Sequence, residues 1–190
     1  MQVICDVDKR IIGVHIGCPG SCADSSVFKR MPHYKESHRF FSPGEYLLAD
    51  SAYGLSNTCI PSYKSPAANR KDNKEFNYCI AKSRVRNEHC IGILKSRWGS
   101  LQEMRQQLRS REDMQSLIRW VVACCVLHNM LARLGDAWYD MYLEDDSEDE
   151  AEVALNDAVQ TDSTAFNFRE ALKKVTLETN YVRGILPIQQ

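Results

Sequence analysis

The chain has 190 residues, of which 44% are hydrophobic and 26% charged. This length and composition are typical of a globular domain with a real core and some tail. We find no run of about 18 apolar residues, the length that a transmembrane helix needs. The amino terminus also lacks the charged and apolar regions of a signal peptide. We therefore expect neither a membrane span nor secretion.

The net charge of −1 hides an uneven distribution of charge along the chain. Residues 1–135 carry 20 Lys and Arg against 12 Asp and Glu, a net of +8. Residues 136–163 carry 11 acids and no base, and residues 164–190 carry four bases and two acids. Basic surfaces attract polyanions because binding releases condensed counterions, so nucleic acid is a reasonable partner. An ordinary solvated face of Lys and Arg is the equal alternative.

The first predicted secondary-structure elements are a β-hairpin and a short helix, which are indicated by β-branched runs and by the turn residues between them. Residues 3–6 and 11–17 predict a hairpin that turns at Asp8 and Lys9. A short helix capped by Asp24 or Ser25 is then expected to carry Val27, Phe28 and Met31 and to end at Pro32. We interpret residues 32–44 as a loop.

A short apolar run, residues 46–49, is typical of a central strand that is covered on both faces. Asp50 follows at the carboxyl end of this strand, which is the edge where open α/β sheets bind ligands. A polar connection over residues 62–74 is expected next.

Two long helices are predicted after that connection. Apolar residues recur every three or four positions between residues 76 and 101. Glu88 lies about 60° from this apolar stripe, at the margin where a helix meets a sheet. The second helix, residues 112–134, has Ser110 and Asp113 as a capping box and Gly135 as its stop. Within it, His128 is a hydrogen-bonded core residue or, less simply, one half of a ligand pair with Cys124.

The core signal stops at Asp136. Residues 136–163 are too charged and too poor in apolar residues to fold alone, which indicates a disordered acidic linker. Ser163 or Thr164 then caps an amphipathic helix with Phe168, Leu172 and Val175 on one side. We therefore predict a folded domain at 1–135, a linker at 136–163 and a helix with a tail at 164–190.

The eight cysteines are scattered through strand-like and helix-like runs, which favours buried thiols over disulfides. His15, Cys18 and Cys22 approach the spacing of zinc ligands. They lack a second Cys or His pair, and Pro19 and Gly20 between them indicate a turn.

Asp50 and Glu88 form the candidate metal site. A carboxylate at the end of a buried strand is costly unless a cation meets it, and a divalent metal can use both acids. Two-metal phosphoryl transfer needs such bridging carboxylates. The alternative is structural: Asp50 caps a turn at residues 51–54, and Glu88 pairs with Arg84 across one helical turn.

Four ordered motifs resemble those of the nuclease domain of Harbinger-type DDE transposases. They are Cys18-Pro19-Gly20-Ser21-Cys22-Ala23-Asp24-Ser25, Leu48-Ala49-Asp50-Ser51-Ala52-Tyr53-Gly54, Arg84-Val85-Arg86-Asn87-Glu88 with Gly92, Leu94, Lys95, Arg97 and Trp98, and Leu127-His128-Asn129. Their order and distances match as well. The resemblance covers about residues 2–134.

The resemblance implies an α/β fold with a ribonuclease-H-like core in which three acids and a divalent metal, Mg²⁺ or Mn²⁺, cut DNA. Asp50 matches the second catalytic acid and Glu88 the third, so both are the expected catalytic and metal-binding residues. Asp24 lies in a motif that supports the site. The first acid belongs to a central strand before the hairpin, which this sequence lacks. Asp6 and Asp8 are the tempting substitutes, yet hairpin geometry explains both.

We expect, on this basis, a transposase-derived DNA endonuclease domain whose activity is impaired by the absent first acid. DNA is the expected partner, together with a DNA-binding partner protein, and the nucleus is the expected location. The alternative is a domesticated, non-catalytic module that binds DNA or a protein. A third possibility is an incomplete gene product without a stable fold.

Overall fold

A computed structural model describes residues 1–134 and 163–186 of the chain. It is a mixture of helices and small sheets, as the α/β class predicts. Two compact units make up the chain. The hairpin unit comprises Met1–Ala23 and Val85–Ala151, and the strand-pair unit comprises Asp24–Arg84 and Glu152–Gln190.

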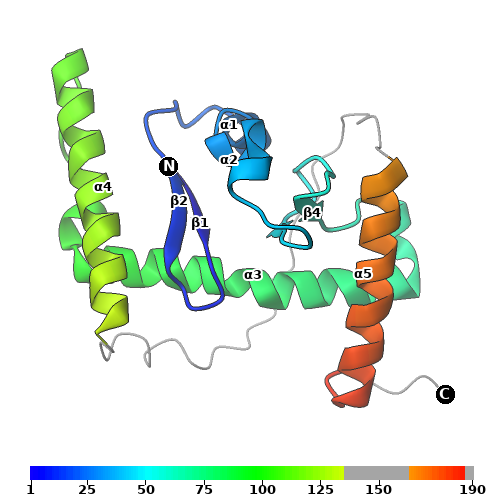
Figure 1. Cartoon of the computed structure of the whole chain (residues 1–190). Coiled ribbons are helices and arrows are strands. Elements are labelled where there is room, and N and C mark those ends of the chain that lie inside the picture. The colour runs from blue at the N-terminus through cyan, green and yellow to red at the C-terminus, as the bar shows by residue number, and fades with distance from the viewer. Residues whose placement is uncertain (135–162, 187–190) are drawn as a thin grey trace. The chain divides into compact units, whose positions relative to one another are not determined.

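The hairpin unit opens with the predicted β-hairpin (Figure 1). Strands β1 (Gln2–Cys5) and β2 (Ile11–His15) pair antiparallel, with an irregularity between Ile4 and Cys5. Lys9 takes a positive φ of 59° in the turn. The Asp6 carboxylate accepts hydrogen bonds from the backbone N–H groups of Asp8 and Arg10, both at 2.9 Å. The turn therefore uses Asp6 as the hairpin interpretation predicts.

Two long helices follow, with boundaries that differ slightly from the predicted ones. Helix α3 spans Lys71–Arg97, and a 3₁₀ turn, η3 (Gly99–Leu101), replaces its expected last turn. Helix α4 spans Arg111–Arg133 and begins at the predicted capping box. The Ser110 hydroxyl accepts from the Asp113 N–H at 3.1 Å, and the Asp113 carboxylate accepts from the Ser110 N–H at 3.0 Å. Gly135 lies outside the described residues.

Apolar side chains from the hairpin, α3 and α4 form the core of the hairpin unit. The buried members are Val3, Ile11, Cys90, Leu94, Leu101, Val121, Cys124 and Cys125. All eight cysteines of the chain are free thiols, as the sequence predicts. Trp98, at the end of α3, packs against this core.

His128 and Asn129 on α4 bind the hairpin through polar contacts. The Asn129 side chain accepts from the Ile11 N–H and donates to the Ile11 carbonyl, both at 2.8 Å. His128 is fully buried, and its Nε2 lies 2.9 Å from the Lys9 carbonyl oxygen. Its Nδ1 lies 3.2 Å from Nη1 of Arg97 on α3. His128 and Asn129 thus join α4, the hairpin and α3, so the core interpretation of His128 is confirmed.

These partners fix the tautomer of His128. A carbonyl oxygen only accepts and a guanidinium only donates, so Nε2 carries the proton and Nδ1 accepts from Arg97. Burial lowers the pKa of His128 below its ordinary value of 6.5, and the positive charge of Arg97 lowers it further. The hydrogen bond to the Lys9 carbonyl acts in the opposite direction but is smaller than the effect of burial. The imidazole is therefore held neutral.

The strand-pair unit begins with the predicted short helix, which is followed by two further short helical segments where a loop was predicted. Helix α1 spans Asp24–Phe28, α2 spans Pro32–Lys35, and a 3₁₀ turn, η1, spans Ser37–Arg39. Pro32 therefore starts a helix and does not end one, and the loop prediction for residues 32–44 is wrong in this part. The reason is that proline's fixed φ and missing N–H suit the first helical position.

Two short parallel strands lie at the centre of this unit. Strand β3 (Leu47–Ala49) pairs with β4 (Cys59–Pro61), and η2 (Ala67–Asn69) follows. The sequence predicts β3 but not β4. Ala49 is buried whereas Leu47 and Leu48 are half-buried, so β3 is not the doubly covered strand that its apolar run indicates.

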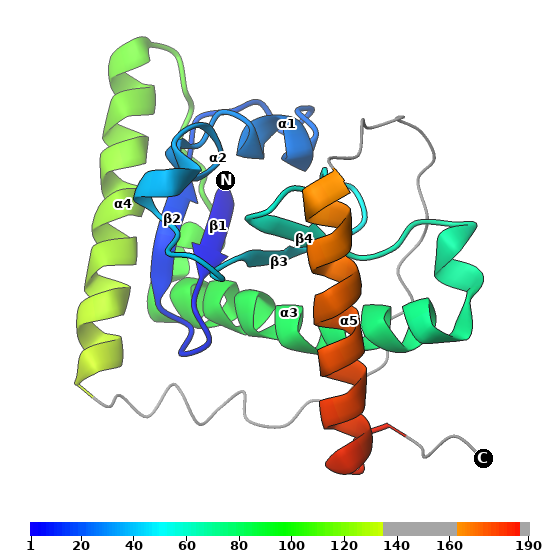
Figure 2. The ribbon, with the colours of Figure 1, turned by 45° about the vertical axis from the view of Figure 1, so that its right-hand side comes forward.

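Helix α5 (Ser163–Val182) confirms the predicted carboxyl-terminal helix and packs within the strand-pair unit (Figure 2). The shared apolar cluster contains the buried residues Ile60, Tyr63, Phe76, Ile80, Leu177 and Leu186. Phe168 and Leu172 pack against it as predicted, but Val175 is 60% exposed and lies off the apolar face. The predicted acidic linker lies outside the described residues.

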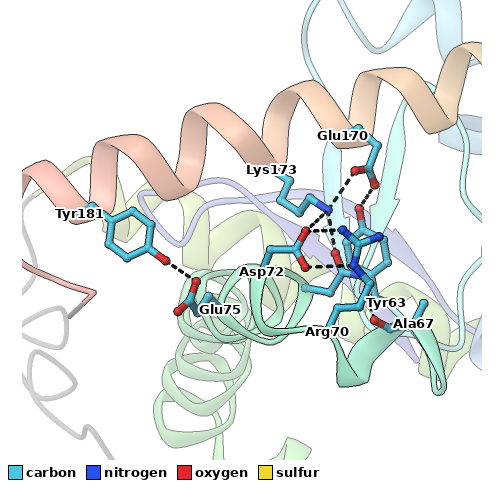
Figure 3. Close-up of polar contacts among 9 residues, drawn as sticks. Tyr63, Ala67, Arg70, Asp72, Glu75, Glu170, Lys173 and Tyr181 are labelled. Carbon is cyan, nitrogen blue, oxygen red and sulfur yellow. Dashed lines mark hydrogen bonds and ion pairs between the residues drawn. The ribbon is translucent and has the colours of Figure 1, made fainter. Parts of the chain in front are cut away.

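Lys173 of α5 is the centre of a polar network with the start of α3 (Figure 3). Its Nζ lies 3.0 Å from the Asp72 carboxylate, 2.9 Å from that of Glu170 and 2.7 Å from Oδ1 of Asn73. Burial alone would lower the pKa of Lys173, but hydrogen bonds to Glu170 and Asp72 outweigh it and raise that pKa. Lys173 thus stays charged while its side chain is only 7% exposed.

Helix α4 passes a length-and-composition test for a membrane-crossing helix within the part of the chain that the structure describes. Core helices of soluble proteins pass the same test, so this is weak evidence for a span. Its buried residues face the hairpin unit's core, whereas Trp120, Val126 and Met130 are about half exposed.

The Asn129 contacts give a stability prediction. Asn129→Ala leaves the Ile11 N–H and carbonyl without their partner, and we expect a loss of about 1–3 kcal/mol of unfolding free energy. Exposed Met130 is the matched control, and Met130→Ala is expected to change stability by less than about 0.5 kcal/mol. Urea unfolding followed by tryptophan fluorescence measures both. Equal stability of the two variants would contradict the role given to Asn129.

The depressed pKa of His128 gives a pH prediction. Below about pH 6.5 the unfolded chain takes up a proton that the folded chain refuses, so the unfolded state binds more protons and stability falls as pH falls. One such group contributes at most about 1.4 kcal/mol per pH unit. We expect the wild type to lose stability more steeply than His128→Gln between pH 6.5 and 5. Parallel curves from denaturant titrations would show that His128 does not titrate in this way.

The Lys173 network gives a third prediction. Lys173→Ala removes the cation that links Asp72 to Glu170 and leaves the buried Oδ1 of Asn73 without its donor. Arg70 still pairs with Asp72, so we expect α5 to loosen at an unfolding cost of about 1–3 kcal/mol. Exposed Lys174 on the same helix is the control, and Lys174→Ala should cost less than about 0.5 kcal/mol. Limited proteolysis within α5 reads out this loosening. Equal cleavage rates for the two variants would refute the network's importance.

Candidate functional site

Asp50 lies directly after β3, in the turn that leaves the strand. Its Oδ1 accepts the Ala52 N–H at 2.6 Å, and its carbonyl accepts the Tyr53 N–H at 3.3 Å. The carboxylate thus shapes its own turn, as the structural alternative predicts. Its side chain is still 39% exposed, and the N–H bond from Ala52 occupies Oδ1 but not Oδ2.

Arg84 is the cation that meets Asp50 in this structure. Its Nη2 lies 3.8 Å from Oδ2 of Asp50, and both side chains are more than a third exposed. Such a long surface pair contributes about 0–1 kcal/mol at most, so it leaves the carboxylate available. The sequence interpretation paired Arg84 with Glu88, one turn along the helix. It missed Asp50 because that contact joins segments 34 positions apart.

The Asp50 charge also acts on a thiol in the neighbouring strand. Cys59 on β4 is buried, and burial together with the negative charge of Asp50 raises its pKa to about 12. The raised pKa keeps the buried Cys59 thiol protonated near neutral pH.

Glu88 lies on α3 and is exposed to solvent. It belongs to the hairpin unit, whereas Asp50 belongs to the strand-pair unit. Among the described residues no group of three or more His, Cys, Asp and Glu side chains is arranged to hold a metal ion. The two oxygen donors nevertheless have the chemistry that Mg²⁺ and Mn²⁺ prefer.

The other residues that the sequence offers for a functional site are Asp24 and the group of His15, Cys18 and Cys22. Asp24 is exposed at the start of α1. Cys18 Sγ lies 3.3 Å from Nε2 of His15, so this pair does come together. The Cys22 N–H bonds the Pro19 carbonyl at 3.0 Å, which is the turn that the sequence indicates.

The sequence of the chain is similar to those of several known proteins. It is 25% identical over 153 residues to "Protein ALP1-like" of Arabidopsis thaliana, covering 74% of this chain and 36% of that protein. It is 26% identical over 139 residues to "Putative nuclease HARBI1" of Homo sapiens, covering 72% of this chain and 38% of the relative. The Mus musculus protein of the same name is 27% identical over 139 residues. The chain thus spans little more than a third of the length of these relatives.

No solved structure matches the chain. A family model described as DDE superfamily endonuclease matches residues 1–129, which is more than half of the sequence and includes the positions of Asp50 and Glu88. The chain therefore belongs to the DDE superfamily endonuclease family.

Proposed function

We propose that the chain is a divalent-metal-dependent DNA endonuclease domain in which Asp50 and Glu88 hold the metal. The observation that carries the proposal is the family match across residues 1–129, which spans both acids. The local settings of the two residues support it. Asp50 lies at the end of a strand, with its side chain 39% exposed and only a long contact from Arg84 to Oδ2, and Glu88 is exposed on a helix.

Each acid has a role that its surroundings favour. A bound Mg²⁺ or Mn²⁺ would stabilise developing negative charge on the phosphate and lower the pKa of attacking water. The Ala52 N–H bond holds the Asp50 carboxylate in one orientation, so little freedom is lost when it meets a cation. Arg84 offsets the Asp50 charge in the absence of metal and can donate to a phosphate oxygen.

The ribonuclease-H-like core and the family's first acid belong to the same proposal. In the described part of the chain β1 pairs with β2 alone and β3 with β4 alone, so each sheet keeps an edge at which another strand can pair. A further strand bearing the first acid would supply the third ligand. We propose that the 190 residues tested by themselves cut DNA slowly, because two ligands position a metal less well than three.

A non-catalytic binding module is the second candidate. It is favoured by the lack of a three-acid cluster in the described residues and by the pairing of Asp50 with Arg84. The net charge of +8 over residues 1–135 suits DNA in either case. A DNA substrate in turn favours action in the nucleus, with or without a DNA-binding partner protein.

A plasmid-nicking assay tests the nuclease function. With Mg²⁺ or Mn²⁺ we expect slow nicking by the 190-residue chain and at least a tenfold loss in Asp50→Asn and in Glu88→Gln, because each removes a metal ligand. Glu178→Gln, which neutralises an exposed acid on α5, is the matched control and should retain wild-type activity.

Three results would count against the nuclease. Nicking that survives both ligand variants would move the site elsewhere. Nicking lost equally in the control would point to a general charge effect. DNA binding without nicking, insensitive to metal and to Asp50→Asn, would establish the binding module instead.

A further inference from the structure

The segment from Lys29 to Phe40, here called the basic segment, concentrates positive charge in the strand-pair unit. It contains four basic residues and one acid, Glu36, and Glu36 pairs with Arg39 across one turn. Its four basic residues, Lys29, Arg30, Lys35 and Arg39, are all exposed. This charge lies on ordered backbone, because α2 and η1 make up most of the segment.

Buried side chains anchor this segment and give its exposed face a fixed presentation. Met31 and His33 within the segment are buried, and so is Phe28, which directly precedes it. The ring of His33 stacks on Phe40 with 4.3 Å between centroids. Cationic side chains on an anchored backbone lose less freedom on binding than those on a loose tail.

Aromatic side chains interleave with the charges. Tyr34 is 45% exposed and Phe40 is 42% exposed, although both are large. Exposed aromatic rings among Lys and Arg are typical of nucleic-acid surfaces, where rings contact sugars and bases while the cations meet phosphates. An acidic protein partner would satisfy the charges but would not by itself account for the rings.

The basic segment is also connected to the candidate site within the same unit. Phe28, which precedes the segment, makes an edge-on contact with Tyr53, with ring centroids 5.7 Å apart. Tyr53 lies in the turn that the Asp50 carbonyl closes. Phe28 also contacts Tyr34 of the segment, at 5.6 Å. One continuous aromatic contact therefore joins the basic segment to the Asp50 turn.

We propose that the basic segment binds the phosphate backbone of duplex DNA next to the cleavage site. This inference rests on the proposed function, since it names the surface that brings DNA to Asp50. The four cations reach phosphates, Tyr34 and Phe40 contact the sugar edge, and the Phe28 to Tyr53 contact fixes the distance from the bound backbone to the Asp50 turn. The binding carries no sequence preference, because phosphate contacts position DNA without reading bases.

Fluorescence anisotropy with a 20-base-pair duplex in EDTA tests the surface apart from the chemistry. The test protein is the full 190-residue chain with Lys29→Gln, Lys35→Gln and Arg39→Gln combined. Each lost phosphate contact lowers the slope of log K against log salt by about 0.9, so we expect a slope about 2 to 3 smaller and at least tenfold weaker binding at low salt.

The matched control removes three exposed lysines elsewhere in the same unit. Lys64→Gln, Lys71→Gln and Lys74→Gln combined change the net charge by the same amount. We expect this variant to keep a slope within about 1 of the wild type, because these lysines lie outside the basic segment. Circular dichroism and thermal unfolding confirm that both variants keep the fold.

The outcomes separate the two proposals. If the wild type binds DNA and both triple variants lose the same affinity, the basic segment is not the contact surface, while the nuclease function is unaffected. If the wild type binds no duplex, the DNA substrate itself is wrong and both proposals fail. If the test variant loses only RNA or acidic-peptide binding, the surface is real but serves another partner, which overturns the inference.

Discussion

The contacts of His128 and Asn129 are the constraint on which the hairpin unit depends. A two-stranded hairpin is marginal alone, and here Asn129 stabilises it by bonding both polar backbone groups of Ile11. The neutral imidazole of His128 also hydrogen-bonds the Lys9 carbonyl and Arg97, so it joins α4 to the hairpin and to α3. The Leu127-His128-Asn129 motif therefore has a structural explanation. It holds the hairpin against the helix that carries Glu88.

The strand-pair unit is stabilised by its contacts with helix α5. Its two strands are only three residues long, and α5 supplies both apolar cover and the Lys173 cation. The Asp50 turn belongs to the same unit as this helix, although the two lie more than 110 positions apart in the chain. The carboxyl-terminal helix is thus structurally connected to the unit that carries the first candidate ligand.

Sequence reasoning identified the elements with strong local signals. The hairpin, α4 with its capping box, α5 and the strand before Asp50 follow from periodicity and capping chemistry. It missed β4, because three residues ending in Pro61 carry too little pattern, and it gave α2 as loop because Pro32 resembles a stop. The pairing of Arg84 with Asp50 and the anchoring by Asn129 were beyond its reach. Contacts between distant segments depend on tertiary packing, which local patterns do not encode.

The proposed function requires that Asp50 and Glu88 bind the same divalent metal. A Mn²⁺ titration followed by electron paramagnetic resonance, with Asp50→Asn, Glu88→Gln and the double variant, measures this directly. Shared coordination predicts that each single variant loses the same bound ion and that the double variant loses no more, because residues acting on one ligand are not additive. Two independently lost ions, or a bound ion that survives both single variants, would contradict a shared metal site.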